Sequence, residues 1–184
     1  VLETTRSFQL AAFLSELAIS SPTQENVTRA ISVLEQVLKG ADDDSRKDVD
    51  FWHCHCLSYE LSNPESVLEL DPMKVVQIFE RGLANLQDIE GKKILWIRCA
   101  EFCARKCPEV VGEIVEKAIA DVGLTIEMPY SRSSRAIRFV TKDWPFLNKL
   151  LSYLLAVLPT NRHSAFFHRF VSERFSDDSE LAAL

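Results

Sequence analysis

Turn-forming residues are scarce in this chain of 184 residues, which holds only five glycines and seven prolines. A β-rich fold with many tight turns needs more of both, because these residues supply the backbone angles that turns require. A glycine-rich loop that wraps a phosphate group is implausible for the same reason. The composition therefore argues against an all-β fold and against nucleotide-loop chemistry.

Long apolar runs and targeting features are also missing. No apolar stretch reaches the roughly 20 residues that span a bilayer, so we expect no membrane partner. The chain begins at Val1, with neither an initiator methionine nor a basic region that leads into a secretory apolar segment. We therefore expect a fragment of a longer protein. Apolar residues make up 47% of the sequence, as in ordinary globular proteins, and we expect a single domain over 1–184 with a flexible tail over 176–184.

Familiar catalytic and metal-binding motifs are absent, including the Gly-x-Ser-x-Gly elbow and the His-Glu-x-x-His zinc signature. The one local cluster is His-Cys-His-Cys over residues 53–56. Successive helical residues diverge by about 100°, so only His53 and Cys56 could share an ion, and Cys99 and Cys103 would have to complete the site. Small thiols buried in helix packing explain the cysteines more simply. We predict no metal, no cofactor, no small-molecule substrate and no enzymatic activity.

The five cysteines follow no disulfide pattern. Their number is odd and no Cys-x-x-Cys pair occurs, which favours free thiols in a reducing, intracellular compartment. Cys99, Cys103 and Cys107 recur every four residues, as buried positions on one helix face do. Arg105 and Lys106 precede Cys107, and basic neighbours lower a thiol pKa. A proline follows this last cysteine, so we expect it to be more exposed than the other two.

Start and stop signals of helices recur along the chain. Ser21, Asp71 and Asp143 are capping residues just before a proline-containing first turn, and Cys107 followed by Pro108 marks another helix start. Gly40 and Gly123 each follow apolar residues at spacings of three and four, as a glycine that ends a helix does. No stretch shows the period-two alternation of a strand. The sequence predicts an all-α fold of about nine helices, over residues 2–20, 22–39, 46–61, 72–87, 91–106, 108–122, 131–141, 144–158 and 163–175.

One segment of sequence recurs along the chain. Residues 78–86 read Ile-Phe-Glu-Arg-Gly-Leu-Ala-Asn-Leu, and residues 114–122 read Ile-Val-Glu-Lys-Ala-Ile-Ala-Asp-Val, 36 positions later. Residues 33–39 (Val-Leu-Glu-Gln-Val-Leu-Lys) fit the same template, and Trp52 and Trp96 stand near the start of the helices that precede the two later copies. Two helices every 35–45 residues are typical of an α-solenoid. The sequence therefore predicts antiparallel helical hairpins that stack as a short α-solenoid.

The repeat resembles the half-a-TPR (HAT) repeat, a relative of the tetratricopeptide repeat (TPR), over roughly residues 22–123. Residues 78–83 match nearly all of the family's second-helix segment, Ile-Phe-Glu-Arg-Ala-Leu. Trp96 and Phe102 match the first-helix pattern Trp-x-x-Tyr-x-x-Phe-Glu, whereas Cys99 and Cys103 stand at its tyrosine and glutamate positions. The resemblance implies an interaction scaffold of a kind often found in nuclear RNA-processing assemblies, and it favours the nucleus over the cytoplasm.

Charge is divided unevenly along the chain. Residues 1–90 hold 16 acidic and 7 basic side chains, a net of −9, whereas residues 91–184 hold 11 acidic and 14 basic, a net of +3. Four basic residues of the second half would form one stripe on a helix: Arg132, Arg135, Arg138 and Lys142. Such a stripe can bind an acidic protein segment or nucleic-acid phosphates. Because the whole chain is acidic, we expect the protein partner.

The expected function is a non-enzymatic protein–protein interaction domain, or scaffold, of a larger intracellular complex. Partners would bind either the groove lined by the first helices of the hairpins or the basic stripe over 132–142. The alternative is an α-solenoid that binds nucleic acid in an RNA-processing or DNA-maintenance assembly. A second, apolar stripe with Phe166 and Phe170 would either cap the stack or form an interface.

Overall fold

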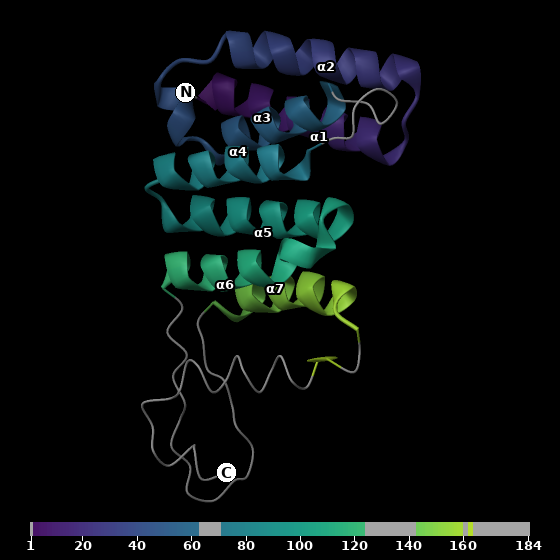
Figure 1. The fold of residues 1–184 in the computed structure, drawn as a ribbon. Coiled ribbons are helices and arrows are strands. Elements are labelled where there is room, and N and C mark those ends of the chain that lie inside the picture. Colours follow the sequence, from purple (N-terminus) through teal and green to yellow (C-terminus); the bar gives the residue numbers. More distant parts are fainter. Residues whose placement is uncertain (1, 63–70, 124–142, 160–161, 164–184) are drawn as a thin grey trace, which may run out of the picture.

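The computed structural model describes residues 2–62, 71–123, 143–159 and 162–163. These residues form seven α-helices and two short 3-10 helices, and they contain no strand (Figure 1). The α-helices are α1 (Leu2–Ser20), α2 (Gln24–Lys39), α3 (Val49–Ser62), α4 (Pro72–Asn85), α5 (Ile89–Lys106), α6 (Val111–Val122) and α7 (Trp144–Val157), and the 3-10 helices are η1 (Asp44–Lys47) and η2 (Pro108–Val110). The prediction of an all-α fold is confirmed for this part of the chain.

All seven α-helices coincide with predicted ones, with ends that differ by three residues at most. The predicted helix over 131–141 lies outside the described residues. So does nearly all of the predicted helix over 163–175, together with the tail over 176–184. The number of helices in the whole chain therefore stays a prediction.

Most helix ends follow the local signals of the sequence. Asp71 caps α4 by accepting a hydrogen bond from the Met73 backbone N–H at 3.1 Å, as predicted. Gly123 ends α6 in the left-handed conformation, with a φ of 65°. Asp143 stands just before α7, yet its carboxylate makes no capping bond, because it forms an ion pair with Lys93 of α5 instead.

Two predicted helix starts are wrong. Ser21 does not cap α2, because its N–H donates to the Leu17 carbonyl at 2.9 Å and completes the last turn of α1. The cap is Thr23, whose Oγ1 accepts a hydrogen bond from the Asn26 N–H at 3.2 Å. Pro108 opens the 3-10 helix η2, and α6 begins three residues later. In both cases the residue types indicated roughly where the helix starts, and the hydrogen bonds determine the residue at which it begins.

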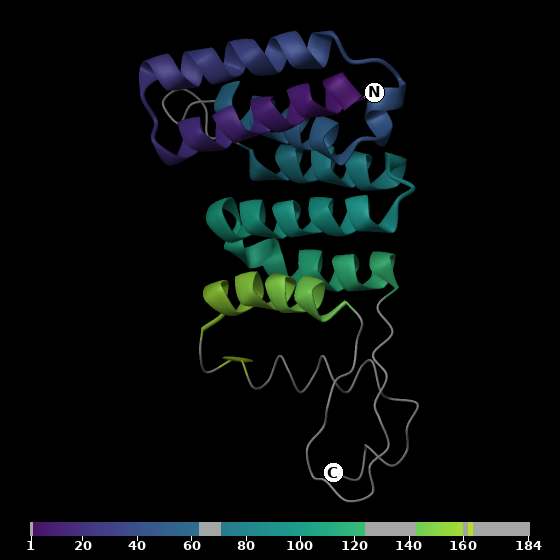
Figure 2. The same ribbon diagram turned by 180° about the vertical axis from the view of Figure 1, so that it is seen from behind.

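The helices are stacked in the order of the chain. Each packs against the next one, and α1 also packs on α3, α3 on α5, and α5 on α7. Figures 1 and 2 show this stack from opposite sides, with α2 at one end and α6 and α7 at the other. We call α1, α3 and α5 the first helices and α2, α4 and α6 the second helices. No helix in the described ranges is long and apolar enough to cross a membrane.

The core consists of two clusters of buried side chains, and α3 lies between them. One cluster joins α1, α2 and α3 and includes Phe8, Leu34 and Cys54. The other joins α3 to α4, α5, α6 and α7 and includes Leu95. Trp52 of α3 is partly buried and packs against both clusters. Because α3 is covered on two sides, its polar residues are drawn into the interior.

The repeated segments fall on second helices, as predicted: 33–39 on α2, 114–122 on α6, and 78–86 at the end of α4 together with its C-cap residue, Leu86. The fifth position of the two later copies is small and buried, Gly82 in one and Ala118 in the other. A Cβ on Gly82 would stand 2.7 Å from Leu95 Cδ2 and 2.8 Å from Trp52 Cγ. Helix α4 therefore approaches α3 and α5 so closely that this position has no room for a side chain.

Candidate interaction surface

The four basic residues predicted to bind a partner, Arg132, Arg135, Arg138 and Lys142, lie within 124–142, outside the described residues. The predicted phenylalanine stripe near the C-terminus lies outside them as well. The other predicted surface, the face of the first helices, falls within the described ranges. That face carries a cavity of about 310 Å³ where α1, α3 and α5 meet.

Charged and aromatic side chains together line this cavity. Six of its lining residues are acidic, basic or histidine: Glu16 of α1, His53 and Glu60 of α3, and Arg98, Glu101 and Arg105 of α5. Phe79 and Phe102 also line it, and both are buried, with ring centroids 6.2 Å apart. The cavity therefore combines apolar walls with an unusual density of charge.

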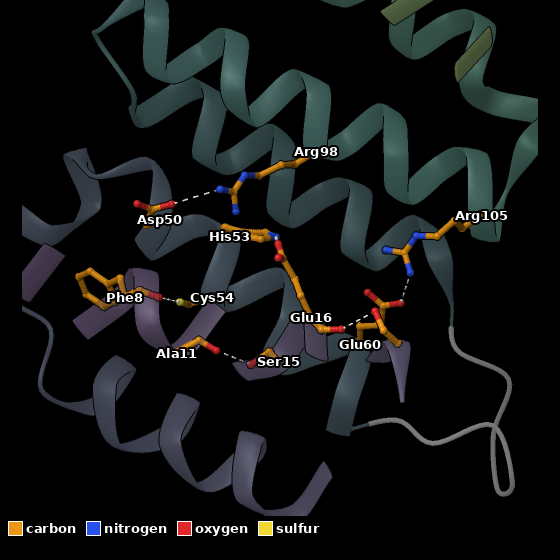
Figure 3. A network of polar contacts seen from close by, with 11 residues as sticks. Phe8, Ala11, Ser15, Glu16, Asp50, His53, Cys54, Glu60, Arg98 and Arg105 are labelled. Carbon is orange, nitrogen blue, oxygen red and sulfur yellow. Dashed lines mark hydrogen bonds and ion pairs between the residues drawn. The ribbon is translucent and has the colours of Figure 1, made fainter. Parts of the chain in front are cut away.

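Two ion pairs cross from α3 to α5 beside the cavity (Figure 3). Arg98 Nη2 lies 3.4 Å from Asp50 Oδ1, and Arg105 Nη1 lies 3.4 Å from Glu60 Oε1. The two carboxylate side chains are only 10% and 8% exposed, so loss of either arginine would leave a poorly solvated charge. Because residue numbers increase in the same direction along both helices, α3 and α5 run parallel.

His53 connects α3 to α1. Its Nε2 lies 3.6 Å from Glu16 Oε1, and its side chain is 7% exposed (Figure 3). Because the carboxylate faces Nε2, that nitrogen carries a proton. Nδ1 of His53 and Nη1 of Arg98 are buried and have no hydrogen-bond partner among the described residues. Two buried nitrogens beside the cavity are thus left without a hydrogen bond from the described residues.

The cysteines pack in the interior. All five are buried free thiols, and Cys99 and Cys103 have no exposed surface, which confirms their predicted packing role. Cys107 is 3% exposed, slightly more than the other two as expected, but it is buried as well because it packs into the larger core cluster. Burial raises the pKa of Cys107 to about 12, so its basic neighbours do not produce a reactive thiolate. Burial raises the pKa of Cys54 to about 12 as well.

The His-Cys-His-Cys cluster of α3 diverges as helical geometry requires. His53 lines the cavity, whereas the Cys54 thiol donates to the Phe8 carbonyl with an S–O distance of 3.3 Å. His55 makes an edge contact with the Phe51 ring, with centroids 4.7 Å apart. Within the ranges that the structure describes, no group of three or more His, Cys, Asp or Glu side chains is arranged to hold a metal ion.

Sequence reasoning missed an apolar stripe on α1. Leu10, Phe13 and Leu17 are 59%, 60% and 51% exposed, and their spacing of three and four places them along one line of the helix. The buried side chains of α1, among them Phe8 and Ala11, lie on the opposite side. The available signal was an apolar helix without a clear polar face, which indicates burial on more than one side.

Comparisons with protein-family models, with curated proteins and with solved structures found no match for this chain. The resemblance to HAT repeats rests on the residues of the sequence and stays a prediction. The function that this resemblance implies stays a prediction as well.

Proposed function

We propose that this chain is a non-enzymatic protein–protein interaction domain, a short α-solenoid that serves as a scaffold in a larger intracellular complex. The observation that supports it best is the packing order, in which successive first helices pack on one another. Stacked hairpins of this kind present extended faces, and binding of other proteins is their common use. The HAT resemblance favours a nuclear location over a cytoplasmic one.

The chemistry of the first-helix face suits binding better than catalysis. Its arginines are engaged with the carboxylates of Asp50 and Glu60, which fixes their position. The strongest nucleophile class in the chain, the cysteine thiol, is buried, and burial raises the pKa of Cys54 and Cys107 to about 12. Such thiols are protonated at neutral pH and react poorly.

The basic stripe over 132–142 is the second surface in this proposal, with an acidic protein segment as its partner. The test replaces Arg132, Arg135 and Arg138 by glutamate in the parent protein and measures which partners co-purify. We expect at least one partner to be lost, because three charges change sign at one surface. The matched control is reversal of three exposed basic residues on second helices, Arg29, Lys74 and Arg81.

Two results would contradict these assignments separately. If every partner is retained with unchanged affinity, the stripe is not a binding surface. If the parent protein co-purifies with no protein at all, the scaffold function itself is wrong.

Nucleic-acid binding is the second candidate, and the basic stripe is the observation that favours it. A gel-shift titration would then show affinity that falls steeply as salt rises, because phosphate contacts release counterions. Absence of binding at low salt would remove this candidate. The carboxylates around the cavity of the first-helix face argue against nucleic acid on that side.

A further inference from the structure

The apolar stripe of α1 and the cavity beneath it belong to one surface. Glu16 and Ser20 of α1 line the cavity, and each lies within one helical turn of Phe13 or Leu17. We call this surface the α1 face: the stripe of Leu10, Phe13 and Leu17 together with the cavity. It joins an exposed hydrophobic line to a charged recess.

The stripe has the properties of a helix-binding surface. Three large apolar side chains, each more than half exposed, follow one line of α1. The first helices α3 and α5 also carry apolar residues on more than one side. Helix α3 is covered by α1 and α5, and helix α5 is covered by α3 and α7. Among the described helices, α1 packs on α2 and α3, and the line of Leu10, Phe13 and Leu17 stays exposed. An amphipathic helix laid along such a line would bury it through anchors at the same three- and four-residue spacing.

The charge of the cavity determines which sign of charge a partner must carry to bind there. Arg98 and Arg105 are neutralised by Asp50 and Glu60. Glu16 faces the imidazole of His53, and exposed Glu101 lies beside the Tyr153 hydroxyl, and neither pairs with a lysine or arginine among the described residues. The carboxylates at the cavity therefore outnumber the arginines.

The hydrogen-bonding groups of the cavity point the same way. The carboxylates of Glu16 and Glu101 lie on exposed residues and only accept hydrogen bonds, so they call for N–H donors, which an ammonium or guanidinium group supplies. Nδ1 of His53 and Nη1 of Arg98, which have no partner within the described ranges, are fully buried, so a partner at the surface does not reach them.

We propose that the α1 face binds a basic amphipathic helix of a protein partner. Its apolar side chains lie on Leu10, Phe13 and Leu17, and a lysine or arginine at its edge reaches the cavity near Glu16 and Glu101. This inference rests on the proposed interaction function and names a partner opposite in charge to the one expected for the basic stripe. Nucleic acid and anionic lipid are repelled by the same carboxylates.

The test is fluorescence anisotropy with a labelled helical peptide of about 18 residues, built from leucine and lysine with leucine on one face. A peptide with glutamate in place of lysine, and one with serine in place of leucine, serve as controls. We expect only the leucine–lysine peptide to bind. Phe13→Ser and the pair E16Q/E101Q should each weaken it roughly tenfold, the effect of losing one or two charged hydrogen bonds or an anchor.

The matched control for charge is E25Q/E35Q, which removes two exposed carboxylates from α2 and should leave the affinity unchanged. Equal binding of the lysine and glutamate peptides would overturn the proposal. So would equal weakening by E16Q/E101Q and E25Q/E35Q, which would indicate general charge attraction, or tighter binding of RNA or anionic vesicles than of the peptide. Because Phe13 is exposed, we expect the Phe13→Ser variant to keep the wild-type unfolding midpoint, and E16Q/E101Q tests the proposal independently.

Co-purification with the parent protein tests this proposal separately from the proposed function. If protein partners co-purify with it but none depends on Phe13, Glu16 or Glu101, the α1 face is not their binding site and the scaffold function stands. If no protein partner is recovered at all, the scaffold function fails first.

Discussion

The first helices and the second helices of this protein differ in how many of their sides are buried. Helices α2, α4 and α6 each bury one apolar face and turn a polar face outward. Helices α3 and α5 are covered on two sides. Of the five buried polar residues in the described ranges, Ser45 lies on η1 and the other four lie on the first helices: Ser15, Asp50, His53 and Lys93. Amphipathic periodicity therefore identifies the second helices, whereas the polar chemistry of the described chain is concentrated on the first.

The ion pairs between second helices and those between first helices differ in their exposure to solvent. Lys117 of α6 pairs with Glu80 of α4 at 3.1 Å, but the two side chains are 45% and 44% exposed, so solvent screens the pair. The Asp50–Arg98 pair between first helices includes a carboxylate that is 10% exposed. The charges of this pair between second helices thus face solvent, whereas the Asp50–Arg98 pair joins two first helices through a poorly solvated carboxylate.

The largest effect is expected from the core beneath the first helices. Leu95→Ala on α5 removes a side chain with no exposed surface, and we expect a loss of about 3 kcal/mol in the free energy of unfolding. Its neighbour Ile94 is 42% exposed, and Ile94→Ala should cost less than about 1 kcal/mol. Urea denaturation measures both, and similar losses at the two positions would contradict the described packing of α5.

The next effect tests the ion pairs. Arg98→Met keeps the aliphatic stem but leaves the Asp50 carboxylate without its counter-ion, and we expect a loss of about 2 kcal/mol. Arg29→Met on α2 breaks a pair whose side chains are 69% and 82% exposed, and should change stability by less than about 0.5 kcal/mol. Thermal unfolding of both variants under one buffer checks this. Equal effects would mean that the first-helix pairs are as solvated as the outer ones.

A smaller effect is expected where a second helix touches two first helices. Gly82→Ala inserts a Cβ within 2.8 Å of Leu95 and Trp52, and overpacking should outweigh the gain in helix propensity by about 1 kcal/mol. Gly112→Ala meets its nearest atom, Leu154 Cδ1, at 3.9 Å, so it should be neutral or slightly stabilising. Calorimetry measures the unfolding temperatures of the two variants. A higher unfolding temperature for Gly82→Ala than for the wild type would show that α4 does not approach α3 and α5 so closely.

The smallest effect is a dependence of stability on alkaline pH. Burial raises the pKa of Cys54 and of Cys107 from 9.0 to about 12, so these thiols stay protonated in the folded state while they ionise in the unfolded chain. Their contribution is fully present below pH 9 and is lost as pH rises towards 12. By pH 9.5 the loss is somewhat under 1 kcal/mol per thiol. Urea midpoints between pH 8 and pH 9.5 should fall less steeply in Cys54→Ala, and an identical slope would contradict the shift.

The sequence predicted the positions of the helices better than it predicted the candidate interaction surface. Spacing and capping residues placed α4 and α6, because one buried face and a local cap are both properties of short segments. The role of Asp143 escaped prediction because its partner, Lys93, lies 50 residues away. The pairing of His53 with Glu16 and the burial of Cys107 depend on tertiary packing in the same way. The stripe on α1 becomes visible only once the opposite face of that helix is known to be buried.

The central claim is that partners bind the face of the first helices and leave the second helices to solvent. The direct test is quantitative co-purification of the parent protein with Glu16 and Glu101 both changed to lysine, compared with Glu25 and Glu35 changed in the same way. The account predicts that the first pair of changes lowers recovery of at least one partner at least several-fold, while the second pair leaves every partner in place. Loss of partners through Glu25 and Glu35, with full retention through Glu16 and Glu101, would contradict it.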